Sequence, residues 1–157
     1  MTSQRSAEFV TPTRDQIVDI SHKHVVLMET SDADDAWIWA NMEHVLLRTV
    51  GRRSGAAHKV ALPFWRDPQG HRIVVASFAG SDRHPAWYLN LTDRSVNPEV
   101  LVRVQGGLWW MDAQILDGDE YDEIWRLLVI DRPHYDDYRT KTDRKIPLVR
   151  LVEKRPG

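Results

Sequence analysis

The chain has 157 residues, with 21 basic and 23 acidic side chains, a net charge of −2 and no cysteine. This length predicts one domain that buries roughly two thirds of its unfolded surface. The lack of cysteine excludes disulfides, a thiolate nucleophile and cysteine-based metal sites, and the charge argues against a nucleic-acid-binding surface. The sequence has no apolar run of about 18 residues that could span a membrane, and residues 1–10 lack the apolar core of a signal peptide. We therefore expect a cytoplasmic protein.

The first part of the chain predicts a helix followed by three strands. Residues 13–28 form the helix, with Thr13 as its N-terminal cap and a ragged apolar stripe, before an acidic break. Strands are predicted at residues 44–50, 59–66 and 72–77. A turn with proline at the position favoured in type I turns joins the last two.

The second part predicts two more helices and three more strands. A short helix is expected at residues 84–91, and residues 100–105 alternate with the period of a strand. A Gly-Gly pair then turns the chain back into a strand at residues 108–116. The next helix begins in acidic residues, stops at Pro133, and presents one apolar face made of Tyr121, Ile124, Trp125 and Leu128. With a last strand at residues 146–152, six short strands indicate an antiparallel barrel or a strongly curved sheet.

The most informative segment is a basic stretch, residues 45–66, which contains no acidic side chain. Within it, an apolar run leads into Gly51-Arg52-Arg53-Ser54-Gly55, which is typical of a strand entering a tight turn. Arginine offers a planar fork of donors, and glycine lets backbone N–H groups approach a ligand, so the turn suits phosphate or carboxylate. The pattern fits a solvated hairpin tip equally well. The basic side chains of the stretch are Arg48, Arg52, Arg53, Lys59 and Arg66.

The sequence predicts no metal site. The seven histidines are scattered, and the one close pair, His22 and His24, would point to different faces of a helix. The acidic residues 32–35 lack the glycine and the closing glutamate of a calcium loop. The chain also has no P-loop, no G-x-G-x-x-G turn and no serine-centred elbow.

Five segments, in order and in register, resemble the deazaflavin-dependent nitroreductase family. The likeness runs from about residue 44 to residue 153 and leaves residues 1–43 outside it. It implies a mainly β fold with flanking helices, a split antiparallel β-barrel of the flavin-reductase or pyridoxamine-oxidase type. On this basis residues 1–43 form an N-terminal helical extension and residues 44–157 the coenzyme-binding barrel. The matching segments are residues 46–55, 74–77, 84–91 with 97–100, 135–138 and 142–147.

The resemblance also implies coenzyme F420, an 8-hydroxy-5-deazaflavin, as the hydride carrier. In the family a basic turn grips the coenzyme's phosphate and glutamate tail, although the usual Pro-Arg pair is replaced here by His58-Lys59. The deazaflavin lies beside the segment matching residues 77–80, where the family more often has Lys or Asn and then Gly. Phe78 could stack on the coenzyme, line the acceptor pocket or lie in the core. The implied coenzyme contacts are Arg52, Arg53, Lys59, Ser77, Phe78, Ala79, Gly80, Trp87 and Asn90.

Tyr135 and Tyr138 are the implied catalytic side chains, with Ser77 as a further source of a proton. Three positions apart on a helical turn, the two phenols share a face, and the matching tyrosines of the family border the acceptor pocket. A phenol is protonated at neutral pH, so it can hold or protonate an acceptor. Both tyrosines could instead simply close the barrel mouth.

The resemblance therefore implies an F420H2-dependent oxidoreductase that passes a hydride to an electron-poor acceptor, such as a quinone or a nitroaromatic. An FMN-binding barrel reductase and a non-catalytic F420-binding protein stay open as alternatives. We expect a small-molecule acceptor, no nucleic acid, and a monomer or homodimer. Residues 1–43 could cover the acceptor pocket, bind a partner or contact a membrane surface.

Overall fold

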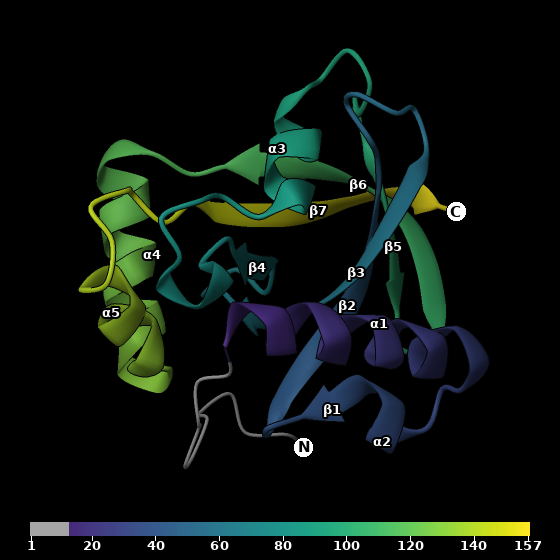
Figure 1. The fold of residues 1–157 in the computed structure, drawn as a ribbon, viewed down its shortest axis with the longest axis horizontal. Helices are drawn as coiled ribbons and strands as arrows, with labels where there is room; N and C mark the ends of the chain where they lie inside the picture. The colour runs from purple at the N-terminus through teal and green to yellow at the C-terminus, as the bar shows by residue number, and fades with distance from the viewer. Residues whose placement is uncertain (1–12) are drawn as a thin grey trace.

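The computed structural model describes residues 13–157, and a closed antiparallel barrel forms its centre (Figure 1). The strand order is β1-β2-β3-β4-β7-β6-β5, and an additional pairing of β2 with β5 closes the ring. The six predicted strands are thus confirmed as the strands of the barrel, and β1 is a short addition at its edge. The strands are β1 (Ile38–Trp39), β2 (Met42–Val50), β3 (Ala57–Arg66), β4 (Arg72–Val75), β5 (Val100–Val104), β6 (Gly107–Ile115) and β7 (Leu148–Pro156).

The barrel closes at β2, which pairs with a strand on each side. Leu47 lies opposite Val60 of β3 and also opposite Val102 of β5. The alternation predicted for β5 is present, because Val100, Val102 and Val104 are buried while the residues between them are half-buried. Each fully buried aliphatic side chain contributes about 1.5–3 kcal/mol. Buried side chains of these strands, among them Leu47, Val74 and Met111, form one hydrophobic cluster in the barrel.

The helices lie around the barrel (Figure 1). Thr13 caps α1 as predicted, and it does so through a capping box: its Oγ1 accepts from the Gln16 N–H, and the Gln16 side chain accepts from the Thr13 N–H. Among residues 13–157, none of the helices is long and apolar enough to cross a membrane. The helices are α1 (Arg14–Thr30), α2 (Asp34–Trp37), the 3₁₀ turn η1 (Phe78–Gly80), α3 (Ala86–Thr92), α4 (Gly118–Asp131) and α5 (His134–Arg139).

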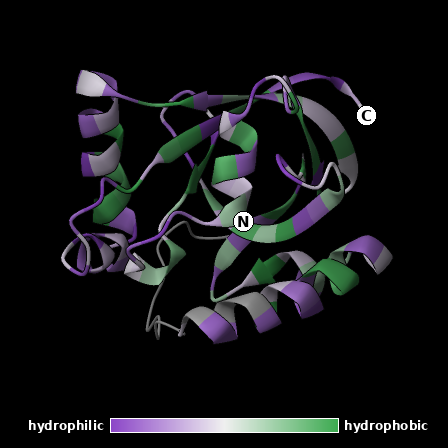
Figure 2. Ribbon diagram, turned by 45° about the horizontal axis from the view of Figure 1, so that its top comes forward, coloured by the Kyte–Doolittle hydropathy of each residue, from purple (hydrophilic) through white to green (hydrophobic). Residues whose placement is uncertain are grey.

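The apolar face predicted for α4 is confirmed. Figure 2 shows the hydrophobic side of this helix turned toward the barrel and its hydrophilic side turned outward. The four predicted residues are buried, and they share a hydrophobic cluster with Tyr135 and Tyr138 of α5. This packing fixes α5 against α4, and it therefore sets the position of the two tyrosines.

The N-terminal segment packs directly onto the barrel. Val25 and Met28 of α1 form a buried cluster with Ala36, Trp37 and Leu46, the last of which belongs to β2. β1 extends the sheet by pairing with the start of β2. α1 consequently covers one side of the barrel, next to β3.

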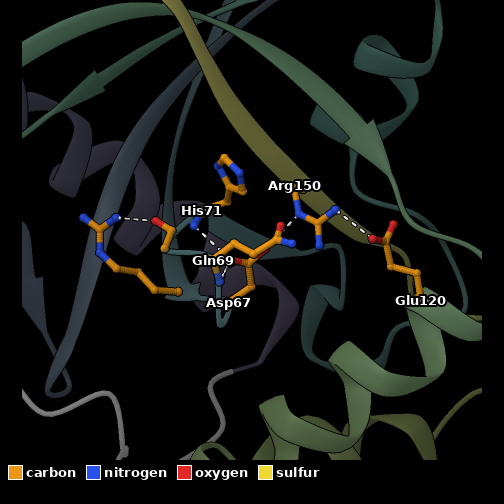
Figure 3. Close-up of polar contacts among 7 residues, drawn as sticks. Asp67, Gln69, His71, Glu120 and Arg150 are labelled. Atoms are coloured by element: carbon orange, nitrogen blue, oxygen red, sulfur yellow. Dashed lines mark hydrogen bonds and ion pairs between the residues drawn. The ribbon is translucent and has the colours of Figure 1, made fainter.

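A buried ion-pair network ties the turn between β3 and β4 to the rest of the molecule (Figure 3). Arg150 of β7 donates to Asp67 at 2.8 Å and to Glu120 of α4 at 3.1 Å. The other carboxylate oxygen of Asp67 accepts the backbone N–H groups of Gln69 and His71. Removing one partner of such a buried pair costs about 3–5 kcal/mol. The network lies outside the candidate site and serves the fold.

Candidate functional site

A cavity of about 850 Å³ is lined by residues of α1, β2, β3, α3 and α5 and by the segment that follows β4. Its size lies within the range of roughly 300–1,000 Å³ that is usual for small-molecule sites. Most of the residues predicted from the sequence meet here. Those on its wall are Lys59, Ser77, Phe78, Ala79, Trp87, Asn90, Tyr135 and Tyr138, whereas Arg52, Arg53 and Gly80 lie outside its lining.

The segment after β4 has an unusual backbone. Phe78, Ala79 and Gly80 have φ angles of 44°, 54° and 78°, so three successive residues are left-handed. Such a conformation costs a non-glycine residue about 1–3 kcal/mol. At Gly80 a side chain is also excluded, because a Cβ there would lie 2.9 Å from the carbonyl oxygen of Tyr138. The close approach at Gly80 is thus to α5, and the strained pair Phe78-Ala79 faces the cavity.

Arg144 holds this strained segment in place. Its guanidinium donates to the carbonyl oxygens of Ala76 at 3.1 Å, of Ser77 at 2.8 Å and of Ser81 at 2.8 Å. These three carbonyls flank the left-handed residues on both sides. The sequence placed Arg144 in a matching segment but gave no sign of this role, because its partners are far away along the chain.

The basic turn is attached to the cavity through Asn90 of α3. The Asn90 Oδ1 accepts both the backbone N–H and the Nη1 of Arg52, at 3.2 and 2.9 Å. Its Nδ2 donates to Thr49 Oγ1 at 3.3 Å. Asn90 is buried and its amide is engaged on both sides, so it positions the turn. Arg52 is half-buried by this contact, whereas Arg53 is exposed to solvent.

Lys59 is held by the N-terminal helix. Its Nζ lies 2.5 Å from Glu29 Oε2 of α1, and both side chains are partly exposed. Exposed pairs of this kind contribute little to stability. A ligand phosphate or carboxylate could therefore compete with Glu29 for Lys59.

The tyrosines of α5 lie edge to face, with ring centroids 5.9 Å apart. Tyr135 is 3% exposed, and burial raises the pKa of its phenol, although the positive charge of Arg132 opposes the rise. His134 contacts both rings, at 4.3 and 5.6 Å. Burial and the nearby Arg132 lower the pKa of His134 to about 4. At neutral pH, this wall therefore carries the neutral phenol of Tyr135 and the neutral imidazole of His134.

Histidines gather at the cavity, which the sequence analysis missed. Five of them line it, although their order along the chain gave no sign of convergence. His24 lies flat on Trp39, with centroids 3.5 Å apart, and 4.7 Å from the ring of His44. Burial lowers the pKa of both, that of His44 to about 3. Among the described residues there is no group of three histidine or acidic side chains that could hold a metal ion. The five are His22, His24, His44, His58 and His134.

The profile of the F420H(2)-dependent quinone reductase family matches residues 21–153. The chain belongs to this family. The family is one of oxidoreductases that depend on F420H2, so the resemblance stated from the sequence is confirmed. The match begins within α1, and it thus includes part of the segment that the sequence resemblance had left out.

Individual relatives agree with this assignment. An F420H(2)-dependent quinone reductase of Mycobacterium tuberculosis is 31% identical over 114 residues, which cover 70% of this chain and 73% of that protein. The solved structure of an F420-H2-dependent reductase is 36% identical with a TM-score of 0.58, covering 69% of this chain and 92% of that one. A structure described as a domain-swapped dimer is 30% identical with a TM-score of 0.60, and the match covers 87% of this chain and 97% of that one. The split-barrel fold expected from the sequence is confirmed.

The residues present fit a flat coenzyme with an anionic tail. The cavity wall at Ser77 and Ala79 carries small side chains, which leaves room for a ring close to the backbone. Beyond Asn90, the turn at Arg52 and Arg53 supplies positive charge on the same side of the barrel. No described acidic side chain lines the cavity itself, so its electrostatics do not oppose an anion.

Proposed function

We propose that this protein reduces quinone-type acceptors with F420H2 as its electron donor. The observation that carries the proposal is the convergence of three separately predicted segments on one cavity: the segment after β4, α3 and the tyrosines of α5. They belong to a chain whose family is F420H2-dependent. Reduction of a quinone takes up two electrons and two protons; the bound coenzyme would supply a hydride, and the other proton has to come from the protein or from solvent.

The coenzyme-binding residues we propose form two groups. Ser77, Phe78 and Ala79, together with Trp87 of α3, would hold the ring. Arg52, Arg53 and Lys59 would hold the phosphate and glutamate tail, because several fixed negative charges need several positive partners. Gly80 and Asn90 support these groups through their contacts with α5 and with Arg52.

The proton donor we propose is Tyr135, with Tyr138 and Ser77 as further hydroxyl groups on the same cavity. The guanidinium of Arg132 lies close to the Tyr135 phenol and can only donate, so it leaves the phenol O–H available to an acceptor. Burial keeps this phenol protonated at neutral pH. The tyrosine would therefore hold the acceptor oxygen and hand over its proton as negative charge develops there.

Two further parts of the proposal concern assembly and location. Val26 and Leu27 are exposed apolar side chains on α1, which supports peripheral contact of this helix with a membrane surface. Flotation with lipid vesicles tests this contact. The protein would be a monomer or a homodimer, which light scattering during gel filtration distinguishes.

A titration of the protein with oxidised F420 and with FMN, read by ligand fluorescence, tests the coenzyme. We expect F420 to bind more tightly, and its affinity to fall as salt rises, because FMN lacks the glutamate tail. Steady-state reduction of a soluble quinone by F420H2 then tests the reaction. Equal or tighter binding of FMN would contradict the coenzyme assignment. F420 binding without reduction of a quinone would indicate a non-catalytic coenzyme-binding protein.

A further inference from the structure

We propose that His24 and His44 form a subsite that accepts a hydrogen bond from a hydroxyl or N–H group on the acceptor. The inference rests on the proposed function of the same cavity and adds a substrate class to it. Preferred acceptors would be quinone-type rings that carry a hydrogen-bond donor as a substituent.

The main chain sets the tautomer of each imidazole. His24 Nε2 lies 2.7 Å from the carbonyl oxygen of Ala36, and His44 Nδ1 lies 2.9 Å from that of Met42. A carbonyl oxygen only accepts, so each of these nitrogens carries the hydrogen. In a neutral ring the other nitrogen then has a lone pair, on Nδ1 of His24 and on Nε2 of His44. Within residues 13–157 neither of these two atoms takes part in a hydrogen bond.

Both rings are neutral and held in fixed orientations. Burial is the main cause that lowers both pKa values, and the positive charge of Arg132 further disfavours protonation of His44. Trp39 stacks on His24 at an interplanar angle of 3°, which fixes that ring. Both side chains are buried, yet both line the cavity. The lone pairs are therefore a permanent, preorganised feature of this wall.

The opposite chemistry is found at α5. There, the phenol of Tyr135 lies beside the guanidinium of Arg132, which cannot accept a hydrogen bond, so the phenol O–H remains a donor for a ligand. A plain quinone has only acceptor oxygens, so it can pair with the phenol but not with the bare imidazole nitrogens. An acceptor with a carbonyl and a separate hydroxyl or N–H can accept from the phenol and donate to an imidazole nitrogen. These two hydrogen bonds then fix its orientation in the cavity.

A matched pair of acceptors tests the subsite: 2-(hydroxymethyl)-1,4-naphthoquinone and 2-ethyl-1,4-naphthoquinone, which differ by one hydroxyl at nearly equal size. Binding to the protein without coenzyme is followed by quenching of tryptophan fluorescence, and turnover with F420H2 by kcat/KM. We expect the wild type to prefer the hydroxymethyl compound about threefold to tenfold in both measurements, the effect of one neutral hydrogen bond.

The variant His44→Asn removes the distal nitrogen but keeps an amide N–H for the carbonyl of Met42. We expect it to lose the preference while still binding the ethyl compound. His44→Gln, which puts an amide near the position of Nε2, should restore part of the preference. His71→Asn, which lies outside the cavity, is the matched control and should keep the preference for the hydroxymethyl compound. If His44→Asn does not fold, His24→Gln makes the same test, because it keeps the donor to Ala36.

Equal binding of the two compounds by the wild type would overturn the subsite, and so would a preference that survives in His44→Asn. A binding preference that is lost in His44→Asn, without turnover of either compound, would support the subsite and contradict the proposed reductase function.

Discussion

At the scale of single residues, Tyr135 is a buried phenol beside the guanidinium of Arg132. We predict that Tyr135→Phe lowers kcat for quinone reduction about 100-fold if the phenol is the proton donor, and about tenfold if it only positions the acceptor. Tyr138→Phe should have the smaller effect, and neither change should weaken F420 binding. The measurement is steady-state reduction of a soluble quinone by F420H2.

The prediction is contradicted if Tyr135→Phe and Tyr138→Phe both keep the kcat and KM of the wild type. The tyrosines would then serve only the packing of α5 against α4, and the proton would come from solvent or Ser77. Ser77→Ala, measured beside them, separates these two sources.

At the scale of secondary-structure elements, the left-handed segment depends on Arg144. We predict that Arg144→Met lowers the melting temperature and weakens F420 binding at least tenfold. The change removes the donor from three carbonyl oxygens, and each one that stays buried without a partner costs roughly 1–3 kcal/mol of stability. Arg144→Lys should recover only part of this loss, since lysine keeps the charge but not the planar fork. Arg126→Met, on the exposed side of α4, is the control for removal of an arginine. An unchanged F420 affinity in a folded Arg144→Met protein would show that the segment does not hold the ring.

The two arginines of the basic turn should behave differently. Arg53→Ala should weaken F420 binding roughly tenfold or more without moving the melting temperature, since an exposed charge contributes little to stability. Arg52→Ala should weaken binding and also lower stability by about 1 kcal/mol, because Asn90 Oδ1 loses the Nη1 donor and keeps only the backbone N–H of residue 52. F420 titrations at low and high salt, with thermal melts of the free proteins, check both. Unchanged F420 affinity in both variants would show that the turn is a solvated hairpin tip and does not bind the coenzyme.

At the scale of the whole molecule, the buried histidines make stability depend on pH. The pKa of His44 is lowered to about 3, so between its unfolded value of about 6.5 and pH 3 the unfolded chain binds a proton that the native state does not. The contribution of His44 to the free energy of unfolding therefore falls as the pH drops through this window and is constant above it. For His44 alone the loss from about pH 7 to pH 5 is about 2 kcal/mol, and His134 acts in the same direction.

Urea unfolding at a series of pH values measures this dependence. Below about pH 6.5, stability should change less steeply with pH in His44→Asn than in the wild type, and the difference should correspond to at most about one proton. A wild type equally stable at pH 7 and pH 5 would show that these imidazoles are not buried in their neutral form.

The sequence by itself determined the elements of this protein. The alternation in β5, the N-terminal cap at Thr13 and the apolar face of α4 all appear as predicted, because each depends on residues that are close together in the sequence. The resemblance to a known family also predicted the coenzyme and eight of the residues that line the cavity, because the matching segments keep their order along the chain.

Only the tertiary structure decided what the polar side chains do. Asn90, Lys59 and Arg144 find their partners in distant elements, and His24 meets His44 only because α1 and β1 fold back over β2. Periodicity shows which face of a strand or helix is apolar, but it carries no information on which faces meet. That is decided when β2 pairs with β5 and the barrel closes, which fixes where each helix packs and which buried polar groups face one another.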